Sequence, residues 1–209
     1  MNQIIHQNPR NKRSSVARHA SRAWLACLLI VIAGCGSGGG SGDVISPSIT
    51  ASFIPSDTPV SSNLTRLTGS AVGDIVTIQV AIAGPTTSNE IWAFAFDLVL
   101  SSTSVASYID GTVTAGSALH VVAGEQLFTD ASQNDTRVTI AVTKVGNATG
   151  NGIGPTGEVI VSLDFLVEDR DAVSIAIAGS SPAPAALDSN LDPIPSVIFD
   201  TAPAAITGS

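Results

Sequence analysis

The sequence is poor in the side chains on which most enzymes and nucleic-acid-binding proteins rely. Among 209 residues it has 2 cysteines, 3 histidines, 1 tyrosine and 2 tryptophans. All 17 acidic residues, but just four of the nine basic ones, lie beyond position 30, which gives that part of the chain a formal charge of −13. A surface of this sign repels phosphate backbones, so we expect no nucleic-acid partner and assign the acidity to solubility.

Catalytic and metal-binding patterns are also scarce. Nucleophilic catalysis needs a base beside the nucleophile, and the chain beyond Cys35 has one histidine, His120. The segment Asp188–Asp192 has the spacing that begins an EF-hand calcium loop, but Pro193 and Phe199 stand where that loop needs Gly and Glu. We therefore expect no enzymatic activity, no cofactor and no metal, and a hairpin with Asx turns at Asp188–Asp192. A partial calcium site there is the alternative.

The first 34 residues are expected to be an export signal that leaves the mature protein. Residues 1–22 carry five basic side chains and no acidic one, and residues 23–33 form an apolar run too short to span a bilayer as a helix. The end of this run, Ile32-Ala33-Gly34-Cys35, resembles the lipobox of bacterial lipoprotein signal peptides. The resemblance implies cleavage before Cys35, acylation of that cysteine and stable anchoring to a membrane.

The segment after Cys35 is predicted to be a tether. Residues 36–42 read GSGGGSG, a composition typical of flexible linkers. Glycine rather than aspartate follows Cys35, which by resemblance to enterobacterial lipoproteins favours the outer membrane or the cell surface. The predicted parts are therefore a signal peptide at 1–34, a lipidated cysteine with its tether at 35–44, and a domain at 45–209. A secreted protein with a stray thiol at Cys35 is the alternative.

Beyond residue 43, short runs of β-branched and apolar residues are separated by Gly, Pro, Asn and Asp, and no segment sustains a helical period. The clearest runs alternate between an apolar face and a small or polar face. The residues expected to point into a core are Val76, Ile78, Val80, Ile82, Trp92, Phe94, Phe96, Leu98, Leu100, Val138, Ile140, Val142, Val159, Val161, Leu163, Phe165, Val167, Val173, Ile175 and Ile177. Such strands with short turns predict an all-β fold of two packed antiparallel sheets.

The order of these strands resembles that of the cohesin family, whose members are nine-stranded sandwiches with jelly-roll topology. Residues 73–80, GDIVTIQV, are similar to the second strand of the family, and residues 91–98, IWAFAFDL, to its third. Residues 157–167, GEVIVSLDFLV, and 186–192, ALDSNLD, resemble later elements in the same order. The resemblance implies a cohesin-like antiparallel β-sandwich of about nine strands.

Two features depart from the family pattern. Leu100-Ser101-Ser102 stands where cohesins usually have YDP, which puts the tight turn there in doubt. Residues 104–132 match the pattern poorly, so the fourth and fifth strands are not placed.

The resemblance also implies protein–protein binding. Cohesins hold dockerins, small calcium-loaded helical modules, on a flat face built from their third, fifth, sixth and eighth strands. The side chains expected to point outward on the matching strands are Ala93, Ala95, Asp97, Thr139, Ala141, Thr143, Ser174 and Ala176. All except Asp97 are small and uncharged, so they would form a platform that a partner helix can approach closely. The alternative is a solvated sheet face or one that the N-terminal segment covers.

Direct polysaccharide binding and a purely structural envelope spacer are the other functions considered. Cohesins are related in fold to several carbohydrate-binding modules. Sugar binding usually needs exposed aromatic rings, and Trp92 shares the inward parity of the neighbouring phenylalanines. Tyr108, which lies in a loop-like stretch, is therefore the candidate for contact with a sugar.

Overall fold

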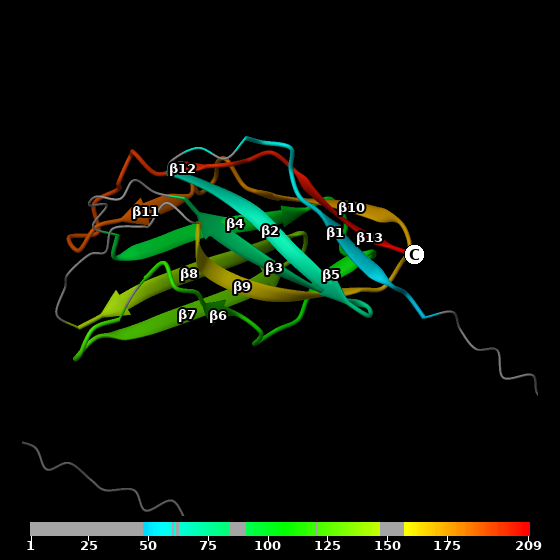
Figure 1. Ribbon diagram of the computed structural model, residues 1–209, viewed down its shortest axis with the longest axis horizontal. Coiled ribbons are helices and arrows are strands. Elements are labelled where there is room, and N and C mark those ends of the chain that lie inside the picture. Colours follow the sequence, from blue (N-terminus) through cyan, green and yellow to red (C-terminus); the bar gives the residue numbers. More distant parts are fainter. Residues whose placement is uncertain (1–47, 60, 62, 84–90, 120, 147–156) are drawn as a thin grey trace, which may run out of the picture. The chain divides into compact units, whose positions relative to one another are not determined.

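The computed structural model describes residues 48–209 except 60, 62, 84–90, 120 and 147–156 (Figure 1). The leader, Cys35, the tether and His120 therefore lie outside the described residues. The described part of the chain contains thirteen strands and no helix. It therefore has no helix that could cross a membrane.

Sheet A has seven strands in the order β1-β13-β10-β4-β8-β7, and β11 pairs with the first residues of β4. All of its strand pairs are antiparallel. Its strands are β1 (Ala51–Ile54), β4 (Ala93–Leu100), β7 (Gln126–Asn134), β8 (Arg137–Val145), β10 (Ala172–Ile177), β11 (Ala185–Leu187) and β13 (Ala204–Gly208). Segments from both ends of the described chain thus meet in one sheet, and Thr50 and Ser209 exchange backbone hydrogen bonds of 3.0 Å.

Sheet B has six strands in the order β12-β2-β3-β9-β5, with β6 also pairing with β9. Its strands are β2 (Leu64–Val72), β3 (Ile75–Ile82), β5 (Ala106–Tyr108), β6 (Thr114–Ala115), β9 (Glu158–Val167) and β12 (Ile198–Phe199). The pairing of β12 with β2 is parallel and the others are antiparallel. The protein is an all-β sandwich with jelly-roll topology, as the sequence predicts.

The core lies between the inner faces of the two sheets. Every side chain predicted to point inward is buried there, except Val159 and Trp92, and the central ones are fully inaccessible to water. Burial of each large apolar side chain contributes about 1.5–3 kcal/mol, so this core is the main stabilising feature of the fold. Trp92 is buried as well, but it precedes β4 and lies outside the main cluster.

The inward prediction for Val159 is wrong, because a β-bulge shifts the register there. Val80 pairs with Val161 while the next residue, Ala81, pairs with Val159, so β9 has one extra residue. The extra residue, Ile160, is fully buried, and Val159 is only partly buried. A bulge of this kind changes which side chain faces the core without breaking the strand.

The thirteen strands also outnumber the nine expected, and two of the four additional strands arise because two positions in the sheets are filled in two pieces. β10 and β11 pair with successive parts of the same edge of β4, and β5 and β6 both pair with β9. The connection between β10 and β11 therefore bulges out of sheet A at the middle of β4.

Candidate functional site

The predicted platform lies on the outer face of sheet A. Its residues belong to β4, β8 and β10, which are neighbours in the order β10-β4-β8-β7. Phe94, Phe96 and Leu98 of β4 point into the core, so the alternate residues point away from it. The strand beyond β8 is β7, and most of it lies within residues 104–132, where the resemblance to cohesins placed no strand.

The strand register arranges the outward residues in rows that cross the sheet. One row joins β11, β4, β8 and β7 and consists of Ala185, Ala95, Ala141 and Asp130. The adjacent row consists of Leu187, Ala93, Thr143 and Phe128. We call the first three residues of the first row, Ala185, Ala95 and Ala141, the alanine row.

Burial separates the eight predicted platform residues into three groups. Ala95, Thr139, Ala141 and Ser174 are exposed, and Thr143 and Ala176 are half-buried. Ala93 and Asp97 are only 5% and 1% exposed, so the prediction that they are open to a partner is wrong. Ala93 is enclosed between Leu187 and Thr143 in its row, and Asp97 is covered by the contacts described next.

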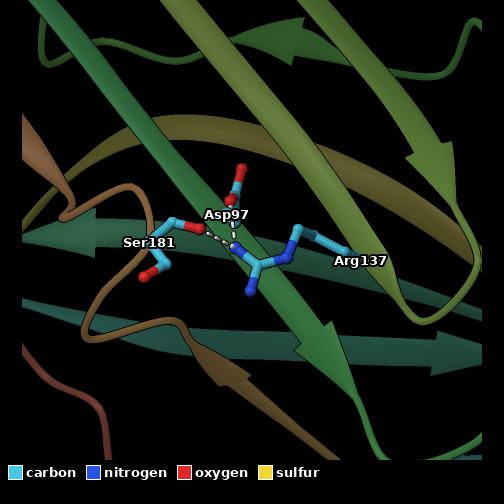
Figure 2. A network of polar contacts seen from close by, with 3 residues as sticks. All are labelled: Asp97, Arg137 and Ser181. Carbon is cyan, nitrogen blue, oxygen red and sulfur yellow. Dashed lines mark hydrogen bonds and ion pairs between the residues drawn. The ribbon is translucent and has the colours of Figure 1, made fainter.

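Asp97 is buried on the outer face because Arg137 crosses over it. One guanidinium nitrogen, Nη1, donates to Oδ2 of Asp97 and, at 3.0 Å, to the backbone carbonyl of Ser181 (Figure 2). Ser181 belongs to the β10–β11 connection, and Ala178 in the same connection donates its N–H to the carbonyl of Asp97 at 2.9 Å. We call these contacts the Arg137 bridge. It ties β8, β4 and the connection together across the middle of the face.

The Arg137 bridge leaves one oxygen of Asp97 without a hydrogen bond. Oδ1 is buried and has no partner, and Figure 2 shows that the carboxylate oxygen without a dashed line points away from the guanidinium. A buried acceptor left unsatisfied costs about 1–3 kcal/mol. The Arg137 bridge therefore joins the strands at the middle of the face, but it leaves one carboxylate oxygen of Asp97 without a hydrogen bond.

The structure adds two apolar side chains and one acidic side chain that the sequence did not indicate. Phe128 of β7 is 55% exposed and Val145 of β8 is 49% exposed, and both point outward at the same end of the β7–β8 hairpin. Asp130, two residues after Phe128, is exposed opposite Ala141. The alternation that could have revealed β7 is weak, since its inward positions include the polar Thr129 and Gln133.

Tyr108 does not offer an exposed ring, contrary to the prediction. It is 8% exposed and belongs to the core, where its ring centroid lies 6.0 Å from that of Phe165. Its backbone N–H donates to the side chain of Gln133 at 2.8 Å, which links β5 to β7. The ring faces inward because β5 pairs with β9 and shares its inner face, so stacking on a sugar is sterically closed to it.

A buried ion pair lies at one end of the sandwich. Lys144 Nζ is 3.7 Å from Glu125 Oε2, and both side chains are completely inaccessible to water. The ammonium also lies 5.9 Å from the ring centroid of Trp92, and Glu125 accepts a hydrogen bond from the N–H of Val122 at 3.0 Å. These contacts anchor the segment before β7 to the inner face of β8, and so help to position Phe128.

The hairpin after β11 has the predicted Asx turns. Asp188 Oδ1 accepts hydrogen bonds from the N–H groups of Asp192 and Asn190 at 2.9 and 2.8 Å. The hydrogen bond from Asp192 has the largest effect and lowers the pKa of Asp188, desolvation by burial opposes it, and the hydrogen bonds from the backbone and side chain of Asn190 lower the pKa further. Across the described ranges no group of three or more His, Cys, Asp or Glu side chains is placed to hold a metal ion.

Comparison of the fold with solved structures finds cohesin modules, and no family model or curated protein matches the sequence. A type II cohesin domain from the cellulosome of Acetivibrio cellulolyticus is 19% identical, with 76% of this chain and 95% of that chain covered and a TM-score of 0.48. A non-cellulosomal cohesin from the archaeon Archaeoglobus fulgidus is 13% identical, covers 73% and 86%, and has a TM-score of 0.42. A chain of a type II cohesin–X–dockerin complex from Acetivibrio cellulolyticus is 9% identical, covers 73% and 93%, and has a TM-score of 0.44. The chain is thus similar to members of the family that its sequence resembles.

Proposed function

We propose that this chain is a non-catalytic binding module that docks a dockerin-type protein through the outer face of sheet A. We further propose that lipid on Cys35 holds the module at the outer membrane or cell surface, in assemblies that degrade polysaccharides. The observation that carries the docking proposal is the alanine row, three small side chains side by side on β11, β4 and β8. Small uncharged side chains let another backbone approach a sheet closely and leave few polar groups to desolvate.

The neighbourhood of the alanine row supports the same function. Phe128 and Val145 add exposed apolar surface beside small residues, which is the composition found at the centre of protein interfaces rather than on a plain solvated face. The Arg137 bridge ties the connection to β4 and β8, which restricts the movement of this part of the surface. Fixed surfaces lose less entropy on association than flexible ones.

Direct polysaccharide binding is the second candidate and has less support from the described side chains. Trp92 and Tyr108 are both buried, so neither offers a ring to a sugar. Phe128 is the exposed aromatic ring on the outer face of sheet A, and it has no hydrogen-bonding group with which to orient a sugar. A structural spacer explains the sandwich but gives no reason for the exposed Phe128.

An affinity experiment tests the docking function. The purified chain is immobilised, exposed to extract of the source organism with calcium present, and eluted with a chelator. We expect capture of a protein with paired calcium-binding loops that chelation releases. Ala95→Arg and Ala141→Arg should each weaken this capture about a hundredfold or more, because each places a large charged side chain in the contact.

Ser70→Arg is the matched control, since Ser70 is exposed on the outer face of sheet B. It adds the same charge to a strand of the other sheet and should leave capture unchanged. Retention of the partner by both Ala95→Arg and Ala141→Arg would show that another surface is used. If the folded chain captures no protein that the chelator releases, the docking proposal fails. Polysaccharide binding or a spacer role would then take its place.

A further inference from the structure

Resting on the proposed lipid anchor at Cys35, we propose that the end of the sandwich at which the chain enters β1 is a membrane-contact surface. Apolar side chains at that end of the outer face of sheet B lie against the headgroup region of a zwitterionic lipid bilayer. We call these side chains, Val72, Ile75 and Leu166, the apolar row. The contact uses sheet B, so it leaves the outer face of sheet A open to a partner.

The strand register places the side chains of the apolar row side by side. Val72 pairs with Ile75 across the β2–β3 turn, and Ile75 pairs with Leu166 of β9. Val76 and Phe165, the neighbours of Ile75 and Leu166 along the strands, are fully buried in the core. The apolar row therefore points outward. Val72 is 82% exposed, Ile75 is 36% exposed and Leu166 is half-buried.

The apolar character is confined to this end of the face. The next two rows are polar and consist of Ser70, Thr77 and Asp164, and then of Thr68, Gln79 and Ser162. The hydroxyl of Thr77 donates to Asp164 at 2.7 Å, which ties the first polar row together. An apolar rim with polar side chains behind it suits a surface that enters the headgroup region by a few ångströms and stays hydrated above it.

The chain enters the domain beside the apolar row. Ala51, the first residue of β1, donates its N–H to the carbonyl of Gly73 in the β2–β3 turn at 2.7 Å, and both lie at the end where the C-terminus emerges (Figure 1). Residues 36–48 join this point to Cys35, and they begin with the linker sequence GSGGGSG. A flexible segment of about 13 residues spans about 20 Å. A nine-residue strand such as β2 is about 30 Å long, so a lipid on Cys35 keeps this end of the sandwich nearer to the bilayer than the opposite end.

The charges beside the apolar row determine which lipid it fits. Asp74 is exposed in the β2–β3 turn. The exposed turn between β9 and β10 carries three acidic side chains and one basic side chain, which are Glu168, Asp169, Arg170 and Asp171. Anionic lipid repels this excess of carboxylates, so the row fits a zwitterionic surface. A second copy of the row would bring the same acidic turns together, which disfavours a dimer at this end.

The anchor makes so small a contact sufficient. Burial of one valine side chain strengthens binding by about tenfold, which alone does not hold a free domain on a membrane. A short flexible tether keeps the row at a local concentration on the order of millimolar, so a weak contact is populated. The apolar row therefore orients a domain that the lipid already holds, and the unanchored domain leaves the membrane.

Fluorescence of the acylated mature chain in vesicles tests this inference. Val72→Cys introduces a thiol for the environment-sensitive dye NBD, since acylation occupies Cys35 and the mature chain has no other cysteine. The labelled chain is reconstituted in phosphatidylcholine vesicles that contain nitroxide-labelled lipid. Val122→Cys is the matched control, because Val122 is 52% exposed and precedes β7 at the opposite end of the sandwich.

We expect the lipid to quench the dye at position 72 at least about threefold more strongly than the dye at position 122. Ile75→Ser should lower the quenching at position 72 severalfold, because it removes apolar surface from the row. Replacement of part of the phosphatidylcholine by phosphatidylglycerol should also lower it, through repulsion of the acidic turns.

The remaining outcomes separate this inference from the proposed function. Equal quenching at positions 72 and 122 overturns the inference and leaves the anchor and docking in place. A dye at position 72 that is shielded from water but not quenched by lipid shows that the tether or a second copy covers the row, which also overturns it. Quenching that rises with phosphatidylglycerol contradicts the zwitterionic surface. A mature chain without acyl groups on Cys35, as measured by mass spectrometry, removes both the anchor and this inference, whereas a failed affinity capture by an acylated chain affects docking alone.

Discussion

At the scale of single residues, Arg137 neutralises a carboxylate that the fold has removed from water. Asp97 is 1% exposed, whereas the side chain of Arg137 is 37% exposed. Loss of one member of a buried pair usually costs more than the pair itself contributes, because the remaining charge stays desolvated. The stability of the middle of sheet A therefore depends on Arg137 more than its partly exposed position suggests.

Arg137→Ala should lower the free energy of unfolding by about 2 kcal/mol, less than for a fully buried pair because water reaches the guanidinium. The double variant Asp97→Asn/Arg137→Ala should recover part of this loss, since no charge then remains buried. Urea denaturation followed by circular dichroism measures both changes. Arg170→Ala, at an exposed turn, is the control. A loss below about 0.5 kcal/mol for Arg137→Ala would mean that water or rearrangement solvates Asp97.

Sequence patterns predicted well which residues point inward, but they predicted less well how exposed the outward-facing side chains are. Alternation is local, so it placed Phe94, Phe96 and Leu98 in the core from β4 alone. The burial of Asp97 depends on Ser181, which no pattern within β4 can indicate. The inward parity of Lys144, in line with Val138, Ile140 and Val142, was visible in the sequence, but its partner Glu125 precedes a strand that no pattern placed.

At the scale of elements, a close backbone contact determines where the short strand β6 lies. Gly116 follows β6 and donates its N–H to the carbonyl of Ile160 at 2.9 Å. A Cβ atom at Gly116 would lie 2.1 Å from the carbonyl oxygen of Val159. The two-residue strand β6 can therefore lie against the bulged part of β9 because a side chain is absent.

Gly116→Ala should destabilise the fold by about 1–3 kcal/mol, because β6 must separate from β9 to admit the methyl group. Thermal denaturation measures the loss, and hydrogen exchange at the Gly116 amide should become faster. Ser117→Ala, at the exposed neighbouring position, should change neither. Equal stability of the Gly116 variant and the native chain would mean that β6 contributes nothing to the packing on β9.

The hairpin after β11 should respond to acid through Asp188. Because its pKa is lowered in the fold by the N–H groups of Asp192 and Asn190, the ionised form is the one that the hairpin stabilises. This contribution is complete above the unfolded value of 3.8 and is lost as the pH falls through the lower folded value. The amide resonances of Asp192 and Asn190 should follow one titration below 3.8, and Asp188→Asn should abolish it. A midpoint above 3.8 would contradict the hydrogen-bonded geometry.

At the scale of the whole molecule, the two sheets have different outer faces. The outer face of sheet B carries polar residues such as Thr68, Thr77 and Gln79, and Thr77 donates a hydrogen bond to Asp164 at 2.7 Å. The outer face of sheet A carries the alanine row and Phe128. Exposed apolar side chains also occur on sheet B, where Val72 and Ile75 are 82% and 36% exposed, so the alanine row, rather than exposed apolar surface, distinguishes the outer face of sheet A.

Anchoring and docking should be separable, because they are assigned to different parts of the chain. Cys35→Ser removes the thiol that acylation needs, so the variant should move from the detergent phase to the aqueous phase when cells are extracted and the phases separated. The thermal midpoint of the domain should not change, since residues 45–209 form a compact unit of their own. The purified variant should bind the same partner with unchanged affinity. A native chain in the aqueous phase would contradict the lipid anchor, and loss of partner binding by Cys35→Ser would place part of the docking surface outside sheet A.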